Sequence, residues 1–170
     1  MAIDFFLSPC KTSSSTPTFG LCDNPPPAKD PAYISEDGTK KNKWIAQVLN
    51  KEKRTVNFYA IDHCVEIPKS NTPTKEESRC DGLLVIEDYY KFVELKDCKL
   101  KDKNWRRKGK NQLETTITIF KEHNPTISIK NISAQLCNKK HRTTTIYQDS
   151  QDEFFEKTGI VLEIKRQVIL

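Results

Sequence analysis

Two apolar runs separated by one short polar turn constrain this chain more than any other feature. The first run covers residues 80–86 and the second covers residues 89–95, with Glu87 and Asp88 between them. The first run is apolar at nearly every position, which is typical of a strand covered on both faces. We therefore expect an antiparallel hairpin of buried strands, with its turn centred between Glu87 and Asp88.

The register of this hairpin predicts a group of charged side chains at one end. Asp81 is expected directly opposite Glu94, where Cβ atoms lie roughly 4.5–5.5 Å apart, and Lys96 shares their face. Two ionised carboxylates this close repel each other unless a cation lies between them, and Mg²⁺ or Mn²⁺ prefers oxygen ligands. Asp81 and Glu94 are therefore candidate metal ligands, with Lys96 as a candidate catalytic residue beside them. The alternative is an ordinary hairpin, because Glu-Leu-Lys is a common tripeptide.

The remaining helices and strands are predicted from the spacing of apolar residues and from the Pro and Gly residues that interrupt it. The predicted segments are a short helix at 43–49 (or a strand), a strand at 54–67, a polar loop at 69–79, a helix at 104–121, a strand at 126–132, a helix at 149–157 and a strand at 160–169. Asn124-Pro125 ends the longer helix, and Gly159 is a C-cap signal for the shorter one. The strand–helix–strand unit in the middle predicts a parallel crossover and thus a mixed α/β class.

Composition divides the chain into two parts. Residues 1–35 are rich in Pro and Ser and predict an irregular arm, whereas residues 36–170 predict a single α/β domain. A chain of 170 residues suits one such core.

Basic residues gather directly after Lys96, although the net charge of the chain is only +5. The candidate nucleic-acid contacts are Lys99, Lys101, Lys103, Arg106, Arg107, Lys108 and Lys110. They either face a phosphate backbone or form an ordinary solvated charge run. Trp105 within this segment is expected in the core rather than stacked on a base.

Two further polar positions interrupt apolar patterns. Asp62 follows Ile61 and is either an additional metal carboxylate or a strand-end residue facing water. His63 is expected on the opposite face and without a role. Gln112 lies one step from the apolar stripe of the 104–121 helix, where it is either a surface amide or part of the site.

Three strings of residues together resemble the PD-(D/E)XK nuclease superfamily. They are Cys80-Asp81-Gly82, Phe92-Val93-Glu94-Leu95-Lys96 and Gln112-Leu113, and the resemblance covers roughly residues 43–137. It implies a restriction-endonuclease-like αβββαβ core, with Asp81 and Glu94 binding Mg²⁺ or Mn²⁺, Lys96 as the catalytic lysine and Gln112 as the glutamine that some branches place on the following helix. Cys80 departs from the proline in the family name. Within the superfamily, the segment is similar to small bacterial proteins of unassigned function with a VELK strand and a QL helix.

The residues and the resemblance predict a metal-dependent nuclease acting on DNA or RNA. The alternative is a catalytically inactive nuclease-fold protein that acts as a binding or immunity-type partner. Nucleic acid is the expected partner, with a homodimer or a protein partner as further options. No apolar run approaches the roughly 20 residues that span a bilayer, so we expect no membrane association. Six cysteines without zinc-site spacing predict reduced thiols and a cytoplasmic protein.

Overall fold

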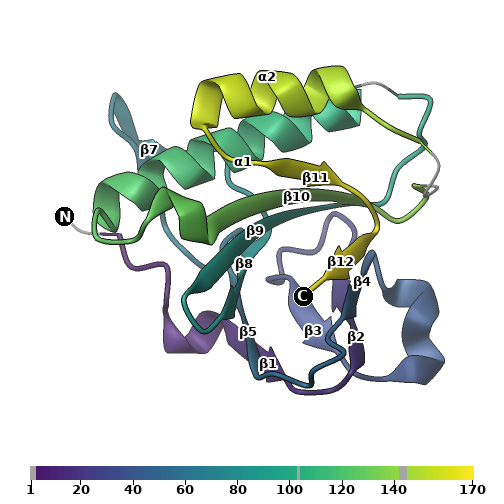
Figure 1. The fold of residues 1–170 in the computed structure, drawn as a ribbon. Helices are drawn as coiled ribbons and strands as arrows, with labels where there is room; N and C mark the ends of the chain where they lie inside the picture. The colour runs from purple at the N-terminus through teal and green to yellow at the C-terminus, as the bar shows by residue number, and fades with distance from the viewer. Residues whose placement is uncertain (1–2, 103, 142–144) are drawn as a thin grey trace.

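The protein is built in three layers (Figure 1). Its structure, a computed structural model, describes residues 3–102, 104–141 and 145–170. Within these residues, helices α1 (Asn104–His123) and α2 (Gln148–Thr158) cover one face of a larger, six-stranded sheet. A smaller, four-stranded sheet packs on the other face. None of the described helices has the length and apolar character needed to cross a bilayer.

The larger sheet is mixed, as the sequence predicts. In spatial order its strands are β1 (Lys11–Ser14), β5 (Val56–Ala60), β8 (Gly82–Ile86), β9 (Tyr89–Lys96), β10 (Ile132–Asn138) and β11 (Leu162–Ile164). Strands β1, β5, β8 and β9 pair antiparallel, whereas β9, β10 and β11 pair parallel. The predicted parallel crossover is confirmed, because α1 connects β9 to β10. The predicted hairpin register is also confirmed, with Gly82 opposite Val93 and Ile86 opposite Tyr89.

The smaller sheet uses segments from both ends of the chain. In spatial order its strands are β12 (Gln167–Ile169), β4 (Ala46–Leu49), β2 (Thr18–Cys22) and β3 (Tyr33–Ser35). The remaining elements are a hairpin of β6 (Pro68–Lys69) and β7 (Thr72–Glu76), and the 3₁₀ helices η1 (Ser8–Cys10), η2 (Gly38–Lys43) and η3 (Ile129–Asn131).

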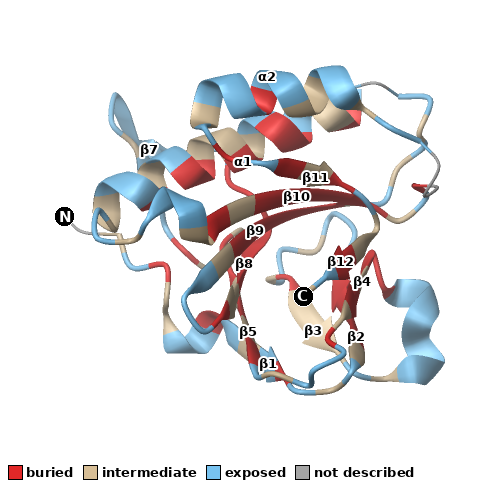
Figure 2. Ribbon diagram, viewed as in Figure 1, coloured by how far each residue is buried: buried red, intermediate tan, exposed pale blue. Residues whose placement is uncertain are grey.

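Strand β8 is buried on both faces, as its nearly continuous apolar run predicts, and β9 is buried from Lys91 to Leu95 (Figure 2). Leu83 and Phe92 belong to the core under the helices. Leu84 and Val93 belong to the core between the two sheets. This alternation places every second residue of β9, including Glu94, on the helix side of the sheet.

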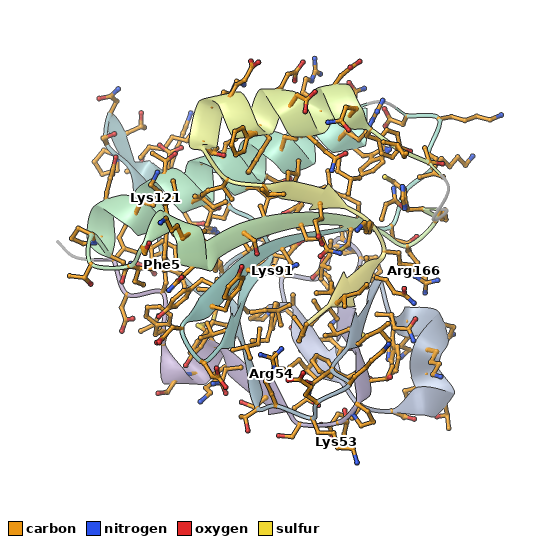
Figure 3. The ribbon with its side chains drawn as sticks, viewed as in Figure 1. Phe5, Lys53, Arg54, Lys91, Lys121 and Arg166 are labelled. Carbon is orange, nitrogen blue, oxygen red and sulfur yellow. A yellow bond between two sulfur atoms is a disulfide. The ribbon has the colours of Figure 1, made fainter. Side chains whose placement is uncertain are left out.

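The predicted irregular arm over residues 1–35 is wrong, because this segment supplies β1, β2, β3 and η1. Phe19 and Leu21 are fully buried between the sheets. Phe5 lies against α1, with its ring centroid 5.2 Å from that of Phe120 (Figure 3). These strands are only three to five residues long. Their apolar alternation is therefore too short to indicate a strand among so many Pro and Ser residues.

Other predicted boundaries also need correction. The predicted helix at 43–49 is strand β4, preceded by η2, so the strand alternative holds. The strand predicted at 54–67 ends at Ala60, and the predicted polar loop contains the β6–β7 hairpin. The predicted strand at 126–132 is a turn followed by η3, and the strand itself, β10, begins only at Ile132. The segment 160–169 divides into β11 and β12 in different sheets. Arg166 lies at that division, where its guanidinium donates to the carbonyl of Trp44 at 3.2 Å (Figure 3).

A disulfide joins Cys10 to Cys64, with their Cα atoms 5.9 Å apart. The prediction of reduced thiols is therefore wrong for this pair, whereas Cys22, Cys80, Cys98 and Cys137 are free. The bond ties the end of η1 to the turn that follows β5. Because the two cysteines are 54 residues apart, no local sequence pattern indicates that they pair.

Candidate metal site

The β8–β9 hairpin places two acidic residues and a lysine at one end of the larger sheet. Asp81 precedes β8, and Glu94 and Lys96 lie at the end of β9. One carboxylate oxygen of Asp81 accepts a hydrogen bond from the backbone N–H of Leu95 at 2.5 Å. The side chains of Asp81, Glu94 and Lys96 line one cavity, so the structure brings together the three residues that the sequence singled out.

Both carboxylates are buried, which changes their acidity. Asp81 is 7% exposed and Glu94 is 1% exposed. Burial, with the nearby charge of Glu94, raises the pKa of Asp81 well above its usual value. Burial raises the pKa of Glu94 to about 7, although the neighbouring Lys96 ammonium opposes this. Burial therefore makes both carboxyl groups weaker acids than exposed carboxyl groups.

One oxygen of Glu94 is left without a partner. Its Oε1 atom forms an ion pair with Lys96, whereas Oε2 is buried and has no hydrogen-bond partner among the described residues. A buried polar atom without a partner costs roughly 1–3 kcal/mol, and more when it is charged. A cation at this oxygen would remove that cost, so the residues present fit a metal ion.

Gln112 holds Lys96 in the site. Its Oε1 atom accepts a hydrogen bond from the Lys96 ammonium at 2.8 Å, and its Nε2 donates to the carbonyl of Arg79 at 2.8 Å. The Thr116 hydroxyl donates to the carbonyl of Gln112 at 2.7 Å and accepts from the backbone N–H of Cys80 at 2.9 Å. These bonds fix α1 against the start of β8 and bring Gln112 into the site.

Gly109 allows α1 to approach the strands closely at the same place. A Cβ atom at this position would lie 2.5 Å from Cδ1 of Leu136 and 3.4 Å from Cγ of Glu94. Packing over β9 and β10 therefore explains why a glycine, which is unfavourable inside a helix, occupies this position.

Asp62 lies in the turn after β5 and lines the same cavity, but other side chains already engage it. One of its oxygens accepts from Nε of Arg79 at 3.2 Å, and the other lies 3.3 Å from Nε2 of His63. The prediction that His63 faces away from Asp62 is wrong. Strand alternation ends at Ala60, and His63 adopts a left-handed φ of 60°. The contact with Arg79 favours a structural role for Asp62.

Several cavity residues were missed by sequence reasoning. These are Asp23, Tyr33 and Lys43, which come from the smaller sheet and the segments beside it. Lys139 also lines the cavity, as its place directly after the parallel strand β10 indicates. Burial, with the charge of Asp62, raises the pKa of Asp23. The Pro-rich surroundings of Asp23 gave no signal that it would face the site. Among the described residues, no three His, Cys, Asp or Glu side chains are already grouped to hold a metal ion.

The basic segment after Lys96 is only partly available to a ligand. Lys99, Lys101, Arg107 and Lys108 are exposed, whereas Lys103 lies outside the described residues. Lys110 is wrong as a nucleic-acid contact, because it is 7% exposed and forms an ion pair with Glu153 of α2. None of the described members of this segment lines the cavity.

The aromatic environment of the same segment accounts for two more of its residues. Trp105 is buried, as expected, with its ring centroid 5.9 Å from that of Tyr147. The Arg106 guanidinium lies 4.3 Å from the centroid of the Tyr147 ring. The side chains of Trp105 and Arg106 at the start of α1 therefore pack against Tyr147 rather than being free to stack on a base.

The described residues define a class of site: a buried carboxylate pair with an ion-paired lysine, at one end of a mixed sheet. Comparisons with models of known protein families, with curated proteins and with solved structures give no match.

Proposed function

We propose that the protein is a metal-dependent nuclease of the PD-(D/E)XK type, which hydrolyses phosphodiester bonds in DNA or RNA. The observation that carries the proposal is the buried Oε2 atom of Glu94, which has no hydrogen-bond partner in the described part of the chain, on a residue that lines one cavity with Asp81. Buried carboxylates in one site destabilise the ionised state unless a cation is present. Mg²⁺ and Mn²⁺ are the cations whose preference for oxygen ligands matches this pair.

Asp81 and Glu94 are the residues that would hold the ion. When bound, the ion would supply Lewis-acid stabilisation and a water molecule with a lowered pKa. Lys96 contributes a fixed positive charge, because Gln112 and Glu94 both hold its ammonium group. Its side chain is 22% exposed, so it can contact a phosphate group in the cavity and stabilise the negative charge that develops there.

The order of elements supports the proposal for the central part of the chain. Strands β5, β8 and β9, helix α1 and strand β10 give three antiparallel strands, a helix and a parallel strand. This is the order that the αβββαβ core requires after its first helix. The separate β6–β7 hairpin is inserted between β5 and β8. The first helix departs from the pattern, because η2 and β4 precede β5. The resemblance is therefore supported over residues 56–138 rather than from residue 43.

A second candidate function is an inactive nuclease-fold protein that binds a partner. The ion pair between Lys96 and Glu94 favours it, because it compensates the buried carboxylate without any metal. The two functions differ in whether the site takes up a divalent ion and in whether it cleaves nucleic acid.

Cleavage assays test the proposal directly. End-labelled single- and double-stranded DNA and RNA are incubated with the protein in MgCl₂, MnCl₂ or EDTA. We expect metal-dependent cleavage that Lys96→Ala and Asp81→Asn abolish. Asp88→Asn is the control, because this exposed acid lies in the turn of the same hairpin. The proposal is wrong if no substrate is cleaved and Lys96→Ala matches the wild type throughout.

Metal uptake is measured separately by thermal denaturation. Stabilisation by a bound ligand follows RT ln(1 + [L]/Kd), so millimolar Mn²⁺ at a site of about 100 μM affinity adds roughly 1–2 kcal/mol. We expect this rise in the wild type and in Asp88→Asn but not in Asp81→Asn. Uptake without cleavage would favour the binding function, and the absence of uptake would exclude the metal site.

A further inference from the structure

The cavity at the candidate site has walls from both sheets. One wall is formed by Asp81, Glu94, Lys96 and Gln112. The other comes from the loop between β2 and β3, which we call the arm loop (residues 23–32), and from its neighbours. Together these walls line a partly open cavity of about 630 Å³. The candidate carboxylates therefore lie between the two sheets rather than on an open sheet edge.

The arm loop is fixed at both ends. Cys22 and Tyr33 pair across strands β2 and β3, and Cys22 and Ala32 are buried. Within the loop, the backbone N–H of Ala28 donates to the carbonyl of Pro25 at 3.2 Å. The run of prolines at 25–27 restricts φ at three successive positions. The loop is thus a formed wall of the cavity.

The confined shape limits what can reach the carboxylates. A volume of this size falls within the range of pockets that take small molecules. A duplex is far larger, since its major groove alone is about 12 Å wide. Enzymes that act on one base in a fitted pocket take single strands or nucleotides extruded from the duplex. We therefore expect an intact duplex to fit this cavity less well than a single strand.

The side chains of the outer wall suit a single strand. Tyr33 is partly exposed and lines the cavity, so its ring is available for stacking on a base. Lys43 is exposed and lines the same wall, where its ammonium can contact a backbone phosphate. Lys139 adds a second cation, held by Asp97 at 3.2 Å.

We propose that this site takes single-stranded nucleic acid and excludes intact duplex, with Tyr33 stacking on a base and Lys43 contacting the backbone. The inference rests on the proposed nuclease function, because it assigns the substrate class of the same site. It adds Tyr33, Lys43 and the arm loop as determinants of specificity outside the carboxylate–lysine group.

Equilibrium binding tests the inference without requiring catalysis. Fluorescence anisotropy is measured with the full-length wild-type protein in EDTA, using a labelled single-stranded 12-mer and a hairpin-closed 12-base-pair duplex, in DNA and RNA forms. We expect the single strand to bind at least about tenfold more tightly. Tyr33→Ala should weaken single-strand binding by about tenfold, from the usual strength of base–aromatic stacking. Tyr89→Ala is the control, since Tyr89 is 52% exposed at the far end of the hairpin.

The outcomes separate this inference from the proposed function. Equal binding of duplex and single strand, or binding of neither, would overturn the inference. It would also be wrong if Tyr33→Ala and Tyr89→Ala behaved alike while both melted at the wild-type temperature. Single-strand binding without cleavage in Mg²⁺ or Mn²⁺ supports the inference and contradicts hydrolysis. Cleavage of blunt duplex as fast as single strand supports hydrolysis and contradicts the inference.

Discussion

The ammonium group of Lys96 donates a hydrogen bond to the side-chain oxygen of Gln112 at 2.8 Å, across the interface between β9 and α1. Because Gln112 also donates to the carbonyl of Arg79, its amide has one orientation. The helix therefore positions the lysine that the strand supplies. This relationship makes Gln112 a positioning residue for the proposed reaction rather than a group that touches substrate.

Replacing Gln112 tests that role. Gln112→Ala should lower metal-dependent cleavage by about 10–100-fold, the usual cost of removing an outer-shell partner. The loss should appear mainly in kcat, because the metal ligands are unchanged. Asn111→Ala is the control, since Asn111 is the exposed neighbour on the same helix. A loss that is confined to thermal stability, with kcat unchanged, would contradict the positioning role.

The metal-free protein should lose stability as pH rises from about 5 to 8. Unfolded glutamate releases its proton near 4.5, whereas burial raises the pKa of Glu94 in the folded protein to about 7. The folded state therefore binds more protons in this window, so the stabilisation is complete below the unfolded pKa and is lost as pH rises through the folded value. Asp81 contributes with the same sign, because burial also raises its pKa.

Urea denaturation in EDTA at several pH values measures this dependence. Glu94→Gln should flatten it relative to the wild type. His141 acts in the opposite direction, because burial lowers its pKa and it disfavours the folded state at acid pH. Subtracting the pH dependence of the free energy of unfolding of Glu94→Gln from that of the wild type removes the contribution of His141. Identical slopes for the two proteins would mean that Glu94 does not titrate in this window.

The hairpin and the three charged side chains at its end could be predicted because their relationship is local. The turn at Glu87-Asp88 sets the register, and strand alternation then places Glu94 and Lys96 on one face. Helix α1 was predictable from its apolar stripe of Leu113, Ile117 and Phe120, which are all buried. These features depend on residues within about twenty positions of each other.

The other wall of the cavity could not be predicted, because it depends on pairing between distant segments. Strand β2 pairs with β4, and β12 from the C-terminal end pairs with β4 on its other side. Asp23 and Tyr33 reach the site only through this second sheet. Lys110 was misassigned for a similar reason, since its partner Glu153 lies 43 residues away.

The disulfide between Cys10 and Cys64 should stabilise the oxidised protein by about 2–4 kcal/mol, because it closes a long loop in the unfolded chain. Cys10→Ser, or reduction of the wild type with dithiothreitol, should shift the urea midpoint downward accordingly. Cys98→Ser is the control, because Cys98 is a free and partly exposed thiol. An unchanged midpoint on reduction, with complete reduction shown by thiol titration, would contradict the prediction.

Gly109→Ala should destabilise the protein although alanine is the better helix former by about 1 kcal/mol. The added Cβ would lie 2.5 Å from Cδ1 of Leu136, so either α1 or the buried Leu136 side chain must move. Overpacking of this kind costs about 1–3 kcal/mol. The displacement would also disturb Glu94, whose Cγ atom lies 3.4 Å from the same Cβ position, so cleavage and metal uptake should fall with stability.

Gly38→Ala is the matched control for this substitution. A Cβ atom at position 38 would have its nearest neighbour, Cε of Lys41, at 3.8 Å, which is ordinary contact with a flexible side chain. Urea denaturation should therefore show a lowered midpoint for Gly109→Ala and little change for Gly38→Ala. If Gly109→Ala raised the midpoint, helix propensity would outweigh packing, and the close approach of α1 to Glu94 would not be required for the fold.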